Sequence, residues 1–135
     1  MYVACFTFDH PQVVDSLLAA RERGVTVRVM FSQRDRNTTN NQGAQLQRLR
    51  GCGCEVRGHR SSRQHAKVLM TEREIVLGSC NFTEASLANS ERGVLLHELA
   101  EDVMLAQKDW YDRLFDAALP FREGLGEVVP PSPER

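Results

Sequence analysis

No hydrophobic run in this sequence approaches the roughly 20 residues that a membrane-spanning helix needs, so we expect no transmembrane segment. The N-terminus has no charged region ahead of an apolar stretch, and no secretory signal is visible. Cysteine is scarce, with four among 135 residues, and without a secretory signal such cysteines are typical of free thiols. These absences predict a soluble intracellular protein.

The formal net charge of −1 hides an uneven distribution along a chain whose length suits one domain. Residues 1–83 carry 12 Lys and Arg against 7 Asp and Glu, whereas residues 84–135 carry 5 against 11. The basic excess is greatest in RGHRSSRQHAK, residues 57–67, which contains no acidic residue. Such a cluster attracts anionic ligands, although a solvated loop has the same composition. The candidate ligand-binding residues are Arg34, Arg60 and Arg63.

Strand-like and helix-like segments alternate along the chain. Short runs rich in β-branched and aromatic residues predict strands. Amphipathic runs predict helices, the first with Pro11 near its first turn and Gly24 just past its end. Strands are expected at 1–8, 25–31, 54–57 and 93–99 and twice within 64–82, and helices at 10–24, 44–51 and 101–119, with a helical turn at 84–89. The predicted stripe of the last helix is Val103, Ala106, Trp110 and Leu114. The alternation predicts an α/β layered domain with some parallel pairing.

The stretch QHAKVLMTEREIVLGSCNF contains two apolar runs flanked by polar residues, which indicates a hairpin. If its loop is residues 72–74, paired residue numbers sum to 146, and His65 lies opposite Asn81 while Lys67 lies opposite Ser79. Cross-strand partners have Cβ atoms roughly 4.5–5.5 Å apart, so four polar side chains would meet on one face. A two-residue loop would instead place His65 and Lys67 on one face of the hairpin and Ser79 and Asn81 on the other.

These four side chains suit one kind of chemistry. A neutral imidazole can attack phosphorus, and a second, protonated imidazole can serve the leaving group. Lysine provides a point charge for phosphate oxygens, and an amide and a hydroxyl provide neutral donors. The set suits a phosphodiester and needs no metal or cofactor. The alternative is a half-buried hairpin with a few exposed polar residues, and the combination of His-x-Lys with Gly-Ser-x-Asn favours the site.

The stretch HAKVLMTE…GSCN resembles the signature of the phospholipase D superfamily: His-x-Lys, four residues, Asp, then Gly-Ser-x-Asn. The flanking segments are similar to its single-motif branch, which includes cardiolipin hydrolases and small bacterial endonucleases. The resemblance implies a three-layer α/β/α phospholipase D-like domain, with a mixed β-sheet flanked by helices, over residues 1–119. Residues 120–135, rich in Pro, Gly and charge, are expected to be a disordered tail.

The resemblance also implies a role for each candidate catalytic residue. His65 is the expected nucleophile, which forms a phosphohistidine intermediate. Lys67 and Asn81 are expected to bind the phosphate with help from Ser79, and Glu91 is expected to orient the histidine. Because the mechanism uses two histidines and the sequence has one motif, we expect a homodimer with a shared active site.

Three departures from the family pattern stand out. Glu72 occupies the position of the Asp, and the gap to Gly78 is one residue shorter, which we place in the hairpin turn. The chain also begins directly in its first predicted strand, where relatives have a preceding helix and often a membrane anchor. We therefore expect a fragment or a truncated product.

Two classes of function stay open. The first is a metal-independent phosphodiesterase that acts on a phospholipid of the cardiolipin type or on single-stranded nucleic acid. The second is a catalytically impaired module that binds nucleic acid or anionic lipid. The expected location is cytoplasmic, or mitochondrion-associated on the resemblance alone. Among the remaining residues, Cys52 and Cys54 suit packing better than the start of a zinc site, His10 suits a helix start, and His97 a structural role in its apolar strand.

Overall fold

The computed structural model of the chain describes residues 1–4, 9–32, 40–59, 65–83, 86 and 88–120. Seven strands within these residues form one sheet, in the order β6-β5-β4-β1-β2-β3-β7. The strands are β1 (Tyr2–Ala4), β2 (Arg28–Ser32), β3 (Glu55–His59), β4 (Val68–Met70), β5 (Glu74–Gly78), β6 (Gly93–His97) and β7 (Leu119–Pro120). β1, β2 and β3 run parallel to one another, and the other neighbours pair antiparallel, so the sheet is mixed.

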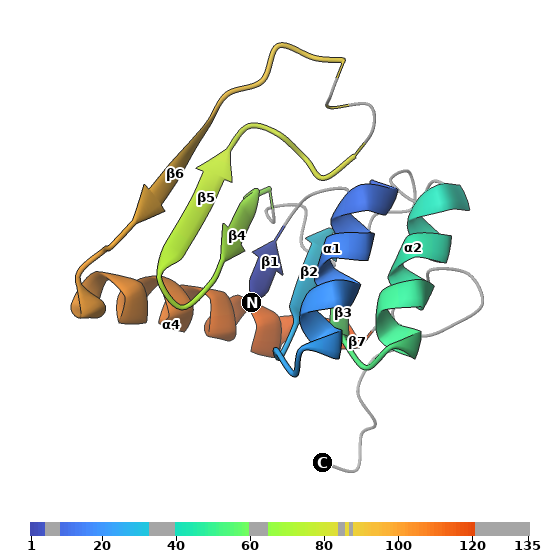
Figure 1. Ribbon diagram of the computed structural model, residues 1–135, viewed down its shortest axis with the longest axis horizontal. Coiled ribbons are helices and arrows are strands. Elements are labelled where there is room, and N and C mark those ends of the chain that lie inside the picture. Colours follow the sequence, from blue (N-terminus) through green and yellow to red (C-terminus); the bar gives the residue numbers. More distant parts are fainter. Residues whose placement is uncertain (5–8, 33–39, 60–64, 84–85, 87, 121–135) are drawn as a thin grey trace.

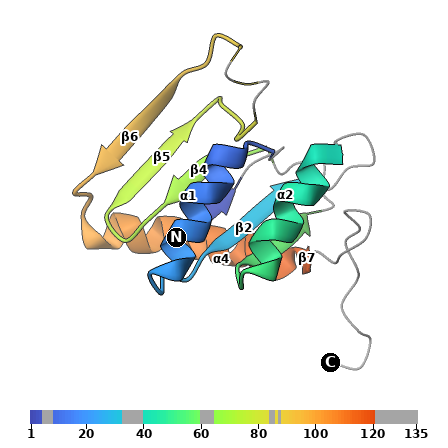
Figure 2. The ribbon, with the colours of Figure 1, turned by 45° about the vertical axis from the view of Figure 1, so that its right-hand side comes forward.

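Helices lie on both faces of this sheet. α1 (Pro11–Glu22) and α2 (Asn40–Gly51) pack on one face, and α4 (Glu101–Ala117) packs on the other (Figures 1 and 2). This arrangement confirms the predicted three-layer α/β/α class. The predicted boundaries differ by a few residues, since α2 begins four residues before the predicted position and β2 begins at Arg28.

The ends of α1 follow the local signals in the sequence. Pro11 occupies the first helical position, where its missing N–H costs nothing, and His10 caps the helix by accepting the backbone N–H of Gln12 on Nδ1 at 3.2 Å. Gly24 follows the helix with a φ of +87°, a conformation that glycine adopts without strain. The buried residues of α1 are Val14, Leu17 and Ala20.

The sheet divides the hydrophobic core into two layers. The layer under α1 and α2 contains Val3, Val14, Leu17, Ala20, Val27, Val29, Phe31, Leu46, Leu49, Cys54 and Val56. The layer under α4 contains Ala4, Met30, Met70, Ile75, Tyr111, Phe115 and Ala118. Alternate residues of the central strands point into alternate layers, as the pleat of a strand requires.

The stripe predicted for the last helix is correct in part, since Trp110 and Leu114 are half-buried against the core but Ala106 is exposed. Tyr111 and Phe115 are the buried residues of α4, whereas Val103 is exposed. The Tyr111 hydroxyl donates to the carbonyl oxygen of Val3 at 2.8 Å and lies 3.1 Å from that of Arg28. Apolar periodicity does not reveal these buried carbonyl partners, and they fix which side of the helix faces the sheet.

One end of the sheet gathers the segments that carry the candidate residues. β1, β2, β3 and β5 end there, and β4 and β6 begin there, as the strand registers require; we call it the site end. Pro120, the first residue of the predicted tail, instead pairs with Arg57 through β7 and β3. The rest of that tail, 121–135, and residues 84, 85 and 87 of the predicted turn at 84–89 lie outside the described residues.

Candidate active site

The candidate residues lie just outside the strands at the site end. Residues 65–67 lead into β4, residues 79–81 follow β5, and residues 91–92 lead into β6. Backbone hydrogen bonds join the three segments, from Gly78 N to the Lys67 carbonyl oxygen at 3.4 Å and from Ser79 N to the Arg92 carbonyl oxygen at 2.9 Å. The prediction that these segments lie close together is therefore confirmed.

The predicted three-residue loop of the hairpin is wrong. β4 and β5 pair with Val68 opposite Leu77, so partner numbers sum to 145 rather than 146. Thr71 N donates to the Glu74 carbonyl oxygen at 2.9 Å, which leaves a two-residue turn. The Thr71 hydroxyl accepts the N–H groups of Arg73 at 3.3 Å and Glu74 at 3.1 Å. A threonine side chain thus stabilises a turn that contains neither Gly nor Asn.

This register also corrects the predicted pairing of the four polar side chains. Lys67 lies opposite Gly78 and shares a face with Leu69, whereas Ser79 continues the opposite face of β5. Neither His65 opposite Asn81 nor Lys67 opposite Ser79 is observed. Two groups of side-chain contacts are observed instead, one between His65 and Lys67 and one around Glu91.

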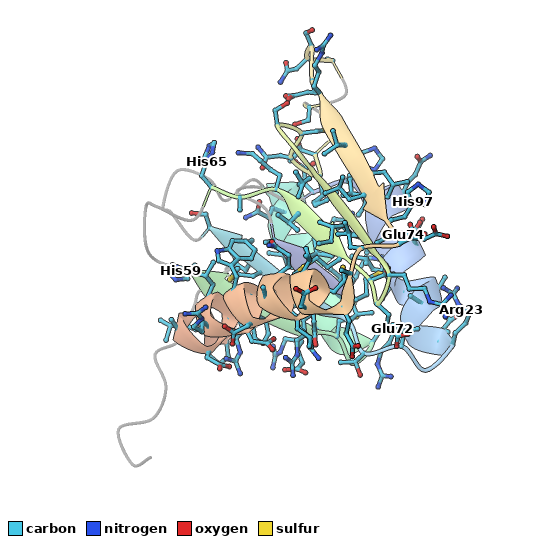
Figure 3. All side chains as sticks on the ribbon, turned by 90° about the vertical axis from the view of Figure 1, so that its left-hand side faces the viewer. Arg23, His59, His65, Glu72, Glu74 and His97 are labelled. Carbon is cyan, nitrogen blue, oxygen red and sulfur yellow. The ribbon has the colours of Figure 1, made fainter. Side chains whose placement is uncertain are left out.

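The first group is the pair of His65 and Lys67. Lys67 Nζ lies 2.8 Å from His65 Nδ1 and 3.2 Å from Nε2, and it donates to the His65 carbonyl oxygen at 2.8 Å. Lys67 is only 9% exposed, whereas His65 is exposed and projects from the body of the molecule (Figure 3). The contact holds the Lys67 ammonium against the His65 ring, whose donor and acceptor nitrogens depend on its tautomer.

The second group is centred on Glu91. Its Oε2 accepts a hydrogen bond from the Ser79 hydroxyl, and its Oε1 accepts one from Asn89 Nδ2 at 3.3 Å. The Ser79 Oγ in turn accepts the backbone N–H of Arg92 at 3.1 Å. The carboxylate is therefore held in place at the start of β6. Its expected role toward His65 stays a prediction, and Asn89 is a partner that sequence reasoning missed although it lies two residues from Glu91.

The N-terminus of α1 lies beside the segment that contains Asn81. The backbone N–H groups of Asp9 and His10 donate to the Phe82 carbonyl oxygen at 2.9 and 3.0 Å. Asn81 itself is half-buried. The positive end of a twelve-residue helix near this segment favours an anion there. The sequence placed His10 at a helix start, but nothing in it connected that helix to the site.

The remaining candidates have different outcomes. Arg34, Arg60 and Arg63 lie outside the described residues, so their binding role stays a prediction. Cys54 packs in the core, where burial raises the pKa of its thiol, and this confirms its packing role. Cys52 is exposed, so the packing predicted for it is wrong. His97 is exposed on β6, so the structural role predicted for it is wrong.

Within the described part of the chain, no three His, Cys, Asp or Glu residues cluster closely enough to hold a metal ion. The same residues contain no helix that is both long and apolar enough to cross a membrane.

A family model described as "Cardiolipin synthase, PLD-like domain" matches residues 1–117. The mitochondrial cardiolipin hydrolase of Danio rerio is 30% identical over 118 residues, which cover 85% of this chain and 50% of the relative. The mitochondrial cardiolipin hydrolase of Homo sapiens is 27% identical over 135 residues, which cover 93% of this chain and 52% of the relative. The chain thus spans about half the length of the curated relatives it matches.

Solved structures show the same fold. The phospholipase D family member Nuc from Salmonella typhimurium superposes with a TM-score of 0.80 at 22% identity, covering 91% of this chain and 83% of that one. NucT from Helicobacter pylori superposes with a TM-score of 0.70 at 17% identity, covering 89% of this chain and 80% of that one. At these identities the likeness establishes the architecture alone.

Proposed function

Because the chain belongs to the phospholipase D-like family, whose model matches residues 1–117, we propose that it is a phosphodiesterase with His65 as its nucleophile. The observation that carries the proposal is the contact of Lys67 Nζ with His65 Nδ1 at 2.8 Å. In the proposed site this cation and this exposed imidazole both contact one phosphate. A charged donor beside the nucleophile stabilises the negative charge that develops on the phosphate oxygens.

The proposed reaction has two steps. In the first, a lone pair of a His65 ring nitrogen forms a bond to phosphorus, the bond from phosphorus to the leaving oxygen breaks, and a second, protonated imidazole gives that oxygen its proton. In the second, water attacks the phosphohistidine, loses its proton to the second imidazole and frees His65. Lys67 and Asn81 bind the phosphate oxygens throughout, and Ser79 assists. No step uses a metal or a cofactor.

Glu91 is proposed to orient His65, directly or through Ser79, which donates to its carboxylate. A carboxylate that already accepts hydrogen bonds from Ser79 and Asn89 holds a fixed position, which is what an orienting group needs.

We propose that the second imidazole is His65 of a second copy in a homodimer with a shared active site. The other described histidines suit the role less well. The His10 ring caps α1, and His97 lies on the opposite side of the molecule from His65 in Figure 3. Burial lowers the pKa of His59 and so disfavours the protonated form that the leaving group requires. A twofold axis beside the site brings two copies of the same group together.

The position of Glu72 favours an active enzyme over a catalytically impaired binding module. This residue lies in the turn between β4 and β5, at the end of the hairpin away from His65 (Figure 3). The departure from the family's Asp therefore lies at the far end of the hairpin, away from His65.

The substrate is proposed to be a phosphodiester of a cardiolipin-type phospholipid or of single-stranded nucleic acid. The named relatives are cardiolipin hydrolases of mitochondria, and a mitochondrion-associated or cytoplasmic location is proposed on that basis. The basic residues Arg34, Arg60 and Arg63 suit either polyanion. Parallel assays on labelled single-stranded RNA and on cardiolipin vesicles distinguish the two. The wild-type protein should cleave the true substrate, and His65→Ala should not.

Mixing experiments test the shared site. Wild-type chains are refolded with an equal amount of His65→Ala, so that random pairing makes about one quarter of the dimers fully wild-type. A shared site then retains roughly 25% of the activity of an all-wild-type sample, whereas independent sites retain about half. Activity near one half, or a fully active monomer, would contradict the shared site.

A further inference from the structure

β6 is the outermost strand of the sheet among the described residues, and its outer side pairs with none of them. Its apolar side chains are exposed, with 51% of Val94, 54% of Leu95 and 39% of Leu96 accessible to solvent. The strand Gly93–His97 contains no Lys, Asp, Glu or Pro, the residues that normally protect an edge strand from pairing with another chain. Both ribbon views place β6 and β5 beside α1 and α2 rather than beneath them (Figures 1 and 2).

The hydrogen-bond pattern shows which backbone groups of β6 are available. Ser79 N donates to the Arg92 carbonyl oxygen, so Ser79 and Arg92 form a hydrogen-bonded pair at the end of the β5–β6 ladder. Such pairs alternate along an antiparallel ladder, and Val94 and Leu96 therefore direct their backbone groups toward β5. The backbone N–H and C=O groups of the intervening residues point to the outer side; these are Gly93, Leu95 and His97.

We propose that this outer side binds β6 of a second copy, antiparallel, about a twofold axis at Leu95. Paired residue numbers then sum to 190, so Gly93 lies opposite His97 and the two Leu95 residues lie opposite each other. Every outward-pointing residue meets an outward-pointing residue, and each such pair exchanges two hydrogen bonds. The two sheets become one continuous sheet.

The charges at the two ends of the strand select this register. Arg92 of each copy then comes near Glu98 of the other, one residue beyond the strand at each end, where Glu98 leaves the extended conformation with a φ of +54°. Moving the axis to position 94 or 96 preserves the direction of the backbone groups but sets Arg92 against Leu96, or Glu98 against Val94. Opposite charges that come together at the ends of paired strands are stabilising, and among these three registers the one centred on Leu95 brings two such pairs together.

The exposed apolar side chains also match across the axis. Val76 is 38% exposed and lies opposite Leu95, so both belong to one face of the sheet. In the assembly, Val76 and Leu95 of one copy form a continuous row with the same two residues of the other copy. On the opposite face, Leu96 of one copy meets Val94 of the other. Each row buries apolar surface that a single copy leaves exposed to water.

This interface differs from the shared active site of the proposed function. The active-site segments lie at the Arg92 end of β6, and the antiparallel arrangement puts the two Arg92 residues six positions apart along the joined strands. At about 3.4 Å per residue the two sites are roughly 20 Å apart and cannot share one phosphate. A five-residue strand also buries less than the roughly 1,600 Å² of a standard interface, so we expect a dissociation constant in the micromolar range or weaker.

Amide hydrogen exchange tests the register directly. Raising the wild-type concentration from about 10 to about 500 µM should slow exchange at Gly93, Leu95 and His97, whereas Val94 and Leu96 are already protected by β5 at both concentrations. Exchange at the three outward amides that does not depend on concentration would overturn the proposal and leave this strand open to an extended segment of another protein.

Sedimentation measurements test the side chains. Leu95→Lys sets two ammonium groups opposite each other at the axis and should weaken this association at least about tenfold, with phosphodiesterase activity unchanged. Leu105→Lys, on α4 and similarly exposed at 58%, is the matched control and should associate as the wild type does. Equal weakening by both variants would contradict the interface. A Leu95→Lys variant that associates as the wild type does would contradict the interface whatever its activity, whereas a wild type without turnover would speak against the proposed function and leave the association tests unaffected.

A charge exchange adds a positive test. Arg92→Glu and Glu98→Arg should each weaken self-association, because each variant then faces its own charge across the axis. An equimolar mixture of the two should associate at least as strongly as the wild type, since both cross-axis pairs are again opposite in sign. A mixture that associates no better than either variant alone would refute the register.

Discussion

Replacing Lys67 with methionine removes the charge of this side chain while keeping most of its length and apolar stem. Lys67 is 9% exposed, and its Nζ lies 2.8 Å from both His65 Nδ1 and the His65 carbonyl oxygen. In the proposed mechanism it is also the charged donor nearest the nucleophile. Removing one such preorganised donor lowers kcat by about 10²- to 10³-fold, or about 2.7–4 kcal/mol of transition-state stabilisation.

The assay is turnover of bis(p-nitrophenyl) phosphate under saturating conditions, with the free energy of unfolding measured in urea on the same samples. We expect the loss to fall on kcat, with the fold retained, because methionine fills the space of the lysine stem. Lys108→Met is the matched control, since Lys108 is exposed on α4 with its Nζ 5.7 Å from the centre of the Tyr2 ring. A Lys67→Met enzyme that retains a third or more of wild-type kcat would refute the role given to this charge.

Three further outcomes are expected. Hydrolysis should proceed unchanged in excess chelator, and loss of turnover that a divalent ion restores would refute the metal-free mechanism. Tyr111→Phe should lower the free energy of unfolding by about 1–3 kcal/mol in urea titrations, because the Val3 carbonyl oxygen loses its buried donor; an unchanged midpoint would contradict this packing. Burial lowers the pKa of His59 below its unfolded value, so His59 binds more protons when unfolded, and its contribution to stability is present above pH 6.5 and lost as the pH falls below it. His59→Gln should therefore flatten the fall in stability between pH 7.5 and 5, and equal slopes for both proteins would show that another group is responsible.

Local signals in the sequence predicted much of the fold. Pro11 and Gly24 marked the ends of α1, and the two apolar runs around the central motif form the predicted hairpin. The register of that hairpin was predicted wrongly by one residue, because the side chain of Thr71 stabilises a shorter turn than its sequence suggests. A one-residue error of this kind moves every side chain to the other face. That is why Lys67 does not lie opposite the serine of its motif.

The sequence predicted that the candidate residues lie near one another, but it did not predict their contacts. Spacing and family resemblance selected His65 and Lys67, and both lie at the site end, but the direct contact between them depends on backbone geometry beyond the end of β4. The hydrogen bond of Glu91 to Ser79 depends on the pairing of β5 with β6, which places residues twelve positions apart side by side. Long-range pairing of this kind leaves no periodic trace in the sequence.

The most direct test of the account is to isolate the covalent intermediate. The enzyme is mixed with excess substrate, quenched in alkali within the first turnover, digested and examined by mass spectrometry. We expect the substrate phosphoryl group on the peptide that contains His65, stable in alkali and lost in mild acid as a phosphorus–nitrogen bond requires, and absent from His65→Ala. An adduct on another residue, or continued turnover by His65→Ala, would contradict His65 as the nucleophile.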